Sequence, residues 1–377
     1  MADGCSRLTS RRFLAIFPQA VSALLPHRVA VIGASGYGGL QTVRLIQVHP
    51  QLRVTFLGGH SSVGSRWRKL APFLETGPDL HVAPPDPDAI AAAADLVVLS
   101  LPNGRASALA PVLLERGLRV VDLSADYRFA DLEDWRQVYG HQVTVERSDA
   151  DLCGEAVYGL PEFNRQAIAT ARLVACPGCF PTTSLLALLP LLQGGLILPE
   201  GIVIDAKTGT SGGGREARQH LLLAEAGEAV APYGVEGHRH TREMEIQAAT
   251  LGRSGPLRLQ FTPHLLPMVR GLLATVYGQL RVPDCPTAQL ASHFRDTYRD
   301  HPCVDVLPVG VYPSTKWVRQ TNRALLSVAT NPHTGQVIVM AALDNLLKGQ
   351  AGQAVQCLNL MLGLPEATGL PLEPFYP

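Results

Sequence analysis

Residues 28–39 read Arg28-Val29-Ala30-Val31-Ile32-Gly33-Ala34-Ser35-Gly36-Tyr37-Gly38-Gly39, and they indicate the fold of this 377-residue chain most directly. A β-branched run typical of a buried strand comes first, and apolar residues then recur at helical spacing from Leu40 to Ile46. Glycines between a strand and a helix let the backbone approach a pyrophosphate, which binds the N–H groups where the helix starts. The stretch therefore predicts a dinucleotide site. A tight turn without a ligand is the alternative. The predicted cofactor contacts are Gly33, Ser35, Gly36, Tyr37, Gly38 and Gly39.

The residues after the second predicted strand discriminate between cofactors. That strand covers residues 52–57, and Gly58-Gly59-His60-Ser61-Ser62 follows it, with Arg66 and Arg68 further on. NAD-specific folds usually place an acidic residue here to bind the ribose hydroxyls, but no acid occurs between Gln51 and Glu75. Hydroxyl and guanidinium groups suit a 2′-phosphate, so NADP(H) is favoured, with Ser61 and Ser62 as ligands. An exposed polar loop is the alternative.

Strand and helix patterns alternate through the first third of the chain, with further strands predicted at 95–100 and 118–123. Such alternation indicates a parallel sheet with helices on both faces. Beyond about residue 200, strand patterns dominate at 201–206, 257–261, 272–282, 324–330 and 336–343, and a turn at 331–335 joins the last two. The predicted fold is α/β. It consists of a Rossmann-type NADP-binding domain and a second α+β domain with a mainly antiparallel sheet, and a helix follows at 345–362.

The composition excludes several classes of protein. Hydrophobic residues make up 46% and charged residues 17%, which supports a sizeable core and argues against disorder of the whole chain. The 32 basic and 32 acidic residues balance, so no charge excess favours nucleic acid or an anionic membrane. The apolar stretch 185–199 is short and contains Pro190, which fits a buried helix rather than a membrane span. Residues 1–27 are expected to be a leader or a disordered segment, with an import signal as the alternative.

Cysteines are sparse, seven in the chain, which indicates a reducing compartment such as the cytoplasm. Cys179 stands in Cys176-Pro177-Gly178-Cys179-Phe180-Pro181, just before a helical pattern whose first turn Pro181 suits. A helix N-terminus lowers the pKa of a thiol from its usual value of about 8.5, so Cys179 is predicted to be a nucleophile. A buried, inert side chain is the alternative. The spacing of Cys176 and Cys179 also permits a redox disulfide or half of a zinc site.

Two histidines, His238 and His240, stand in the most polar stretch of the second half, residues 233–245. Either could act as a general acid–base near neutral pH. Residues two apart share a face only in an extended chain, where the two rings together with the cysteine pair could also bind zinc. Ordinary core or surface histidines are the alternative reading of both.

Several motifs together resemble the N-acetyl-γ-glutamyl-phosphate reductases, an NADPH-dependent family of arginine biosynthesis among the aspartate-semialdehyde dehydrogenase-like reductases. The resemblance extends from about Val29 to Met361. Besides the glycine-rich turn it rests on SLPNG (100–104), DLSADYR (122–128), YGLPE (158–162), PGCFPT (177–182), DAKTGTSGGG (205–214), GHRH (237–240), FTPHLLPM (261–268), Arg270-Gly271 and DNLLKG (344–349).

The resemblance implies a role for each matching residue. Cys179 matches the nucleophile and His238 the acid–base, with His240 as the second choice; Gly33, Gly36 and Gly39 match the dinucleotide glycines. Asn345 matches a residue beside the nicotinamide, which implies that the C-terminal helix returns to the first domain. The motifs add Pro102 to the cofactor site and Asn103, Arg128, Ser211 and Gly212 to the site of a small acyl-phosphate substrate. No metal is expected.

The same resemblance implies a domain plan and an assembly. Residues 28–178 together with 344–377 would form the dinucleotide-binding domain, and residues 179–343 the catalytic, substrate and oligomerisation domain. A homo-oligomer, either tetramer or dimer, is expected. Four positions depart from the family pattern, Cys176, Thr183, Arg242 and Met244. Cys176 replaces an asparagine and could trap Cys179 in a disulfide.

Three other functions stay open from the sequence. The chain could be a sister enzyme acting on aminoadipyl or aspartyl phosphate, a zinc or thiol-redox module built on the cysteines and histidines, or a non-catalytic NADP(H) sensor. The residues leave undecided which histidine carries the proton and whether Cys176 and Cys179 ever pair.

Overall fold

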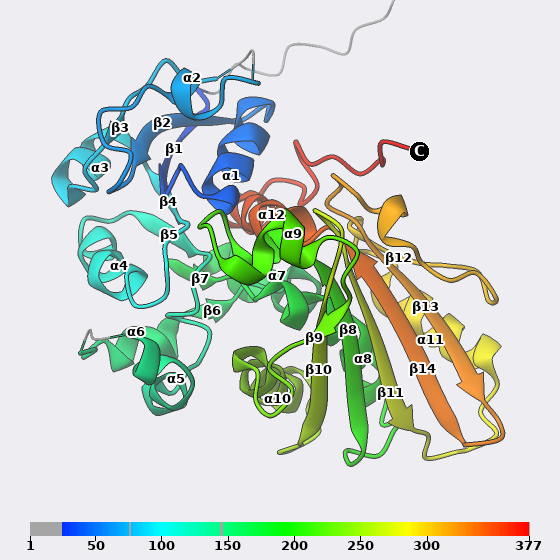
Figure 1. Ribbon diagram of the computed structural model, residues 1–377. Helices are drawn as coiled ribbons and strands as arrows, with labels where there is room; N and C mark the ends of the chain where they lie inside the picture. Colours follow the sequence, from blue (N-terminus) through cyan, green and yellow to red (C-terminus); the bar gives the residue numbers. More distant parts are fainter. Residues whose placement is uncertain (1–24, 75–76, 144–145, 377) are drawn as a thin grey trace, which may run out of the picture.

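The computed structural model describes residues 25–74, 77–143 and 146–376, and in it two β-sheets lie beside each other (Figure 1). The first sheet has the strand order β3-β2-β1-β4-β5-β7-β6, and every neighbouring pair is parallel. Its strands are β1 (His27–Ile32), β2 (Leu52–Gly58), β3 (Val82–Ala83), β4 (Leu96–Leu99), β5 (Arg119–Asp122), β6 (Val157–Tyr158) and β7 (Leu173–Ala175). The predicted Rossmann-type sheet is confirmed, although β1 begins at His27, one residue inside the expected leader.

Helices cover both faces of this sheet because alternate residues of each strand point to opposite sides. Val29 and Val31 of β1 pack against α1 (Tyr37–Gln47), whereas Ala30 and Ile32 pack against α3 (Pro87–Ala93) and α4 (Ala106–Glu115). The remaining helices of this half are short: α2 (Trp67–Leu70), α5 (Leu132–Tyr139), α6 (Ala150–Glu155) and α7 (Pro161–Thr170). The strand order reverses between β1 and β4, and such a switch point opens a crevice at the carboxyl ends of the strands.

The second sheet has the order β12-β13-β14-β11-β8-β10-β9. Its strands are β8 (Ile202–Gly209), β9 (Ala231–Pro232), β10 (Leu259–Leu266), β11 (Leu272–Gln279), β12 (Val304–Val306), β13 (Ala324–Asn331) and β14 (Gln336–Leu343). It is mainly antiparallel, as predicted, but β8 pairs with β10 and β12 with β13 in parallel. The chain leaves β8 through α9 (Leu223–Ala226), β9 and α10 (Arg239–Gly252), which gives the long crossover that a parallel β10 needs.

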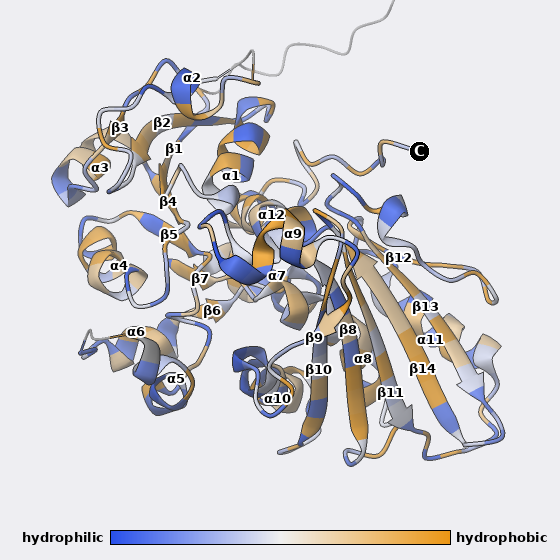
Figure 2. Cartoon of the chain, viewed as in Figure 1, coloured by the Kyte–Doolittle hydropathy of each residue, from blue (hydrophilic) through white to orange (hydrophobic). Residues whose placement is uncertain are grey.

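Three helices cover one face of the second sheet. They are α8 (Cys179–Gln193), α10 and α11 (Thr287–Tyr298), and they enclose a core with alternate residues of β8, β10, β11 and β14. The largely apolar α8 is buried along nearly its whole length, as the sequence predicted for 185–199. The opposite face carries no helix along most of its length in Figure 1, and the residues that β8 and β11 present there are exposed or half-buried, whereas Leu325 of β13 and Ala342 of β14 are buried in a small cluster. Figure 2 shows hydrophobic residues along β8 and β14, in the middle of this sheet.

The C-terminal segment returns to the first sheet, which confirms the expectation drawn from Asn345. After β14 the chain forms a π-helical turn (Leu347–Ala351) and then α12 (Gly352–Met361), which packs against α1 and α7. Lys348 in the turn is fully buried, and its Nζ donates to Glu162 (2.7 Å), Gln353 (2.7 Å) and Gln356 (2.8 Å). A buried charge needs such partners, so the network fixes the π-helical turn against α7.

The leader expected at residues 1–27 falls almost entirely outside the described residues. Among the residues that are described, none of the helices is both long and apolar enough to cross a membrane.

Candidate active site

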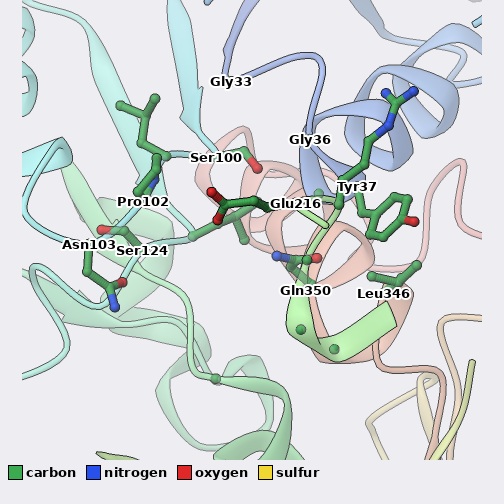
Figure 3. Close-up of a pocket in the computed structure, with 18 of the residues that line it drawn as sticks. Gly33, Gly36, Tyr37, Ser100, Pro102, Asn103, Ser124, Glu216, Leu346 and Gln350 are labelled. Atoms are coloured by element: carbon green, nitrogen blue, oxygen red, sulfur yellow. The ribbon is translucent and has the colours of Figure 1, made fainter. Parts of the chain in front are cut away.

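A cavity of about 1210 Å³ opens between the two sheets, at the switch point of the first (Figure 3). Of the residues predicted for the site, all but Gly39 and His238 line it. The first sheet contributes the glycine-rich turn, residues 59–62 and residues 100–103. The second half contributes Cys179, residues 211–216, Arg218, Arg239 and His240, and the C-terminal segment contributes Asn345, Gly349 and Gln350.

Three glycines of the glycine-rich turn leave no room for a side chain. Gly33 has φ +87°, and a Cβ there would come within 2.0 Å of the Ser100 carbonyl oxygen. A Cβ on Gly38 would meet Ser100 Oγ at 2.6 Å, and one on Gly39 would meet the Gly33 oxygen at 2.2 Å. Gly39 therefore serves the close packing of α1 on the turn at Gly33 and Ala34 rather than the cavity wall. The bare backbone at the start of α1 fits an approaching pyrophosphate.

The end of β2 presents hydroxyls to the cavity, as predicted, but not arginines. Ser61 and Ser62 line the wall, and the buried Ser62 Oγ has no protein partner. Arg66 and Arg68 lie outside the lining, and Arg66 Nε donates to His81 instead (3.2 Å). The arginines were expected to serve a 2′-phosphate together with the hydroxyls. The residue order after β2 could not reveal that the loop carries them away from the site.

Cys179 is the first residue of α8, directly after the N-cap Gly178, and it is partly exposed to the cavity. The predicted position at a helix N-terminus is confirmed, but the predicted lowering of its pKa is wrong. Burial raises the pKa of Cys179 to about 11. The N–H of Phe180 and the charges of Arg128 and Arg239 act in the opposite direction. Desolvation disfavours the thiolate, and sequence spacing alone cannot show how deeply a thiol is enclosed.

Cys176 does not face Cys179. All six cysteines within the described residues are free, and the buried Cys176 lies next to Cys357 of α12. The described residues also contain no group of three or more His, Cys, Asp or Glu side chains that could hold a metal ion. Neither the disulfide nor the zinc site that the cysteine spacing permitted is formed in this part of the chain.

The two histidines lie at the start of α10, where they have different surroundings. His238 is the N-cap, and its Nδ1 accepts a hydrogen bond from the N–H of His240 (3.1 Å). Its ring contacts Phe180, Tyr233 and Phe261, and burial lowers its pKa to about 4. His240 is buried and lines the cavity.

The His240 ring points towards the start of α8. A Cβ on Gly178 would meet its Nε2 at 2.6 Å, and its Nδ1 has no protein partner. Burial, and then the neighbouring charges, lower the pKa of His240 too. Both rings are therefore neutral at pH 7.

Glu243 is the most deeply buried of the site residues that sequence reasoning missed, which also include Arg215, Glu216, Arg218 and Arg239. It is fully buried one turn into α10, and its Oε1 accepts hydrogen bonds from the Gly178 N–H (3.0 Å) and from Tyr158 Oη (2.9 Å). Its Oε2 pairs with Arg128 (3.1 Å). The carboxylate thus ties the residue before Cys179 to two distant segments. In the sequence, Glu243 follows the GHRH motif by only three residues. An acidic residue so close to this motif was the available signal.

Arg128 is buried beside this carboxylate. Its Nε donates to the Cys176 oxygen (2.8 Å) and its Nη2 to the Leu123 oxygen (3.1 Å). Burial opposes the charged form, but the field of Glu243 raises the pKa of Arg128 above its usual value. The guanidinium lines the cavity as predicted, while its identified donors bind protein atoms.

The remaining predicted residues line the cavity between the glycine-rich turn and Cys179. Asn345 Oδ1 accepts from the Gly271 N–H (2.9 Å), and its Nδ2 donates to Ser211 Oγ (3.0 Å). Asn103 Oδ1 accepts from the Ala125 N–H (3.1 Å), while Pro102 and Gly212 line the cavity beside them. Gly349 lies against Cys179, since a Cβ on it would lie 2.8 Å from Cys179 Cβ. The π-helical turn therefore brings the C-terminal segment directly against Cys179.

Two protein-family models match the chain. The model described as the NAD-binding domain of semialdehyde dehydrogenase matches residues 28–171, and the model described as its dimerisation domain matches residues 179–345. Solved structures with this fold include aspartate semialdehyde dehydrogenase II of Vibrio cholerae, complexed with ASA, at a TM-score of 0.68 and 18% identity. That alignment covers 90% of this chain and 99% of that one. At this identity the likeness concerns the fold alone.

Curated relatives are much more similar in sequence. A protein of Parasynechococcus marenigrum (strain WH8102) is 62% identical over 351 residues, which cover 93% of this chain and 98% of the relative. A protein of Synechocystis sp. (strain ATCC 27184 / PCC 6803 / Kazusa) is 53% identical over 350 residues, with the same coverage. Both are named N-acetyl-gamma-glutamyl-phosphate reductase.

Proposed function

This chain belongs to the semialdehyde dehydrogenase family, and we propose that within it the chain is an N-acetyl-γ-glutamyl-phosphate reductase of arginine biosynthesis. It reduces the acyl phosphate with NADPH to N-acetylglutamate 5-semialdehyde and phosphate. The observation that carries this proposal is one continuous cavity. A glycine-rich dinucleotide turn lies at one end of it, and a cysteine at the start of a helix lies at the other.

The cavity fits NADPH at the end formed by the first sheet. Gly33, Gly36 and Gly38 leave the backbone bare at the start of α1, and the unpartnered Ser62 Oγ is free to bind a phosphate oxygen. Asn345 lines the same cavity as the glycine-rich turn and Cys179. When bound, NADPH supplies the hydride for the reduction.

Cys179 performs the first step as a nucleophile. Its sulfur attacks the γ-carbonyl carbon, a C–S bond forms, and the bond from that carbon to the phosphate oxygen breaks, which leaves a thioester on the enzyme. The N–H groups in the first turn of α8 have no partner within the helix and can bind the developing oxyanion. After reduction of the thioester, the carbonyl re-forms as the C–S bond breaks. The semialdehyde then leaves, and the sulfur, released as a thiolate, takes up a proton from solvent to restore the thiol.

A thiol with a raised pKa needs a base when the substrate binds. We assign this task to the histidine pair, with His240 receiving the proton, because His240 lines the cavity and is neutral at pH 7. The departing phosphate then takes that proton. The resemblance to the family favours His238, whose Nδ1 is occupied by the cap of α10.

Replacing the two histidines separately distinguishes their tasks. We expect His240→Asn to lower kcat about a hundredfold, as the loss of a general base typically does. His238→Asn should lower it by about tenfold or less, because asparagine can still cap the helix. Steady-state kinetics of both proteins measure the difference. A larger loss in His238→Asn would transfer the role of base to His238.

The proposed reaction is tested in the reverse direction, because acyl phosphates are unstable. Reduced protein is mixed with NADP, phosphate and N-acetylglutamate semialdehyde, and NADPH absorbance is followed, with NAD and aspartate semialdehyde in parallel assays. We expect phosphate-dependent NADPH formation that prefers the acetylated semialdehyde. A preference for aspartate semialdehyde would make the chain a sister enzyme. Binding of NADP(H) without turnover on either aldehyde would make it a sensor.

We further propose that the chain is a cytoplasmic homo-oligomer. The matched dimerisation model covers the second sheet, whose helix-free face exposes Val203, the second residue of β8. A charged side chain at position 203 would be buried in an interface between two such faces, which would make the free energy of association considerably less favourable. Light scattering of the native chain should give a dimer or tetramer, and Val203→Asp should shift it towards monomer. A monomeric native chain would contradict the proposal.

A further inference from the structure

One wall of the cofactor end of the cavity does not belong to the dinucleotide-binding sheet. Residues 213–222, here called the strap, leave the end of β8 and cross to the glycine-rich turn, where Arg215 Nη1 donates to the Ser35 carbonyl oxygen (2.8 Å). Arg215, Glu216 and Arg218 of the strap all line the cavity. The strap is thus the second half's contribution to a site that the first half builds.

Positive charge in the cavity is divided between its two ends. Four arginines line it, and Arg128 and Arg239 are close enough to Cys179 to lower the pKa of its thiol, so they belong to the substrate end. Arg215 and Arg218 belong to the strap. Arg66 and Arg68, which follow β2, do not line the cavity. The guanidinium groups available to a dinucleotide's phosphates therefore come from the strap.

Glu216 is the single acidic residue among the cavity's described lining residues. In Figure 3 its carboxylate points across the cavity towards the side formed by Ser100 and Pro102. It is 79% exposed and lies 3.5 Å from Arg218, whose own side chain is 50% exposed. A carboxylate in this place repels an anionic cofactor, and it occupies an arginine that would otherwise attract one.

The backbone holds the strap in place at its beginning. Gly214 has φ +88° and ψ −175°, a conformation that only glycine adopts readily, and it turns the chain towards the glycine-rich turn. A Cβ on Gly213 would meet Leu221 Cδ1 at 2.5 Å, so the two ends of the strap pack on each other. The outer end is open to water, with Leu222 50% and Leu223 87% exposed.

We propose that the strap is a clasp on the cofactor, in which Arg215 and Arg218 bind phosphate groups of the dinucleotide. Before the dinucleotide binds, the carboxylate of Glu216 occupies the place of these phosphate groups. The inference rests on the proposed use of NADPH. It adds residues of the second half to the cofactor site and makes binding depend on the exchange of one anionic group for another.

The test is calorimetric titration of the full chain with NADPH, independent of turnover. We expect Arg215→Ala and Arg218→Ala each to raise Kd about tenfold, since a charge-assisted contact to phosphate is lost. Glu216→Gln, which keeps the shape and removes the charge, should lower Kd about threefold. The matched control is Arg258→Ala, which removes an exposed arginine directly before β10. Its Kd for NADPH should stay within twofold of that of the native chain. Parallel titrations with NADH show whether the lost contact was to the 2′-phosphate or to the pyrophosphate.

A second measurement follows the strap itself. Thermolysin should cut the ligand-free chain next to the exposed Leu222 and Leu223, and saturating NADPH should slow this cut at least fivefold, as identified by mass spectrometry. Native NADPH affinity in both arginine variants, or an unchanged cut rate with NADPH bound, would overturn the clasp. Native binding with arginine-dependent affinity but no turnover would instead count against the proposed reaction and leave the clasp standing.

Discussion

Replacing Cys179 with serine should abolish NADPH formation from N-acetylglutamate semialdehyde, with a loss of at least about a thousandfold. A hydroxyl is a far weaker nucleophile than a thiol, and the same enclosure that raises the pKa of Cys179 to about 11 makes an alkoxide there still less accessible. The variant differs by one atom at the start of α8, so the fold and the cofactor end of the cavity should be preserved.

The control for this experiment is Cys285→Ser, which removes a partly exposed thiol elsewhere in the chain. It should retain native turnover, and Cys179→Ser should retain native NADPH affinity. Turnover that survives in Cys179→Ser would exclude the thioester route. Turnover lost in both variants would show that the assay reports a general sensitivity to cysteine replacement rather than one nucleophile.

The order of neighbouring residues in the sequence was enough to predict much of this site. The strand, glycine turn and helix at residues 28–47 are contiguous, so their spacing alone predicts β1, α1 and the bare backbone between them. Cys179 could be placed at a helix start because Pro181 and the apolar run follow it directly. The same is true of the turn that joins β13 and β14.

Properties that depend on distant segments could not be predicted in this way. The pKa of Cys179 is raised by enclosure, and the residues around the thiol come from α8, α10 and the π-helical turn. Arg66 has the right chemistry for a phosphate, but its loop turns it towards His81. Cys176 has the spacing of a redox pair with Cys179, yet it is packed against Cys357 of α12. The sequence pattern indicates which residue types lie near one another along the chain. Tertiary packing decides which groups their side chains contact.

The carboxylate of Glu243 is the strongest case of a role that packing decides. Glu243→Gln should lower kcat at least a hundredfold and the free energy of unfolding by about 3 kcal/mol. The native carboxylate accepts from the Gly178 N–H, Tyr158 Oη and Arg128 Nη1, three donors in a buried space. An amide has one oxygen and one NH₂ group. In either orientation its NH₂ faces a donor, and Arg128 keeps a buried charge without a counterion. Gly178 then either loses its acceptor or keeps only a neutral amide oxygen, a weaker anchor for the position of Cys179 than the carboxylate.

Chemical denaturation and steady-state kinetics together test this role. Glu200→Gln, at an exposed acid before β8, is the matched control and should change neither quantity. The double variant Glu243→Gln with Arg128→Met removes both buried charges. It should recover part of the lost stability, because no uncompensated charge is left, but not the full kcat, because a neutral amide oxygen holds the Gly178 N–H less firmly than the carboxylate does. Recovery of both would make the pair a purely structural element. A native kcat in Glu243→Gln would remove Glu243 from the account of how Cys179 is positioned.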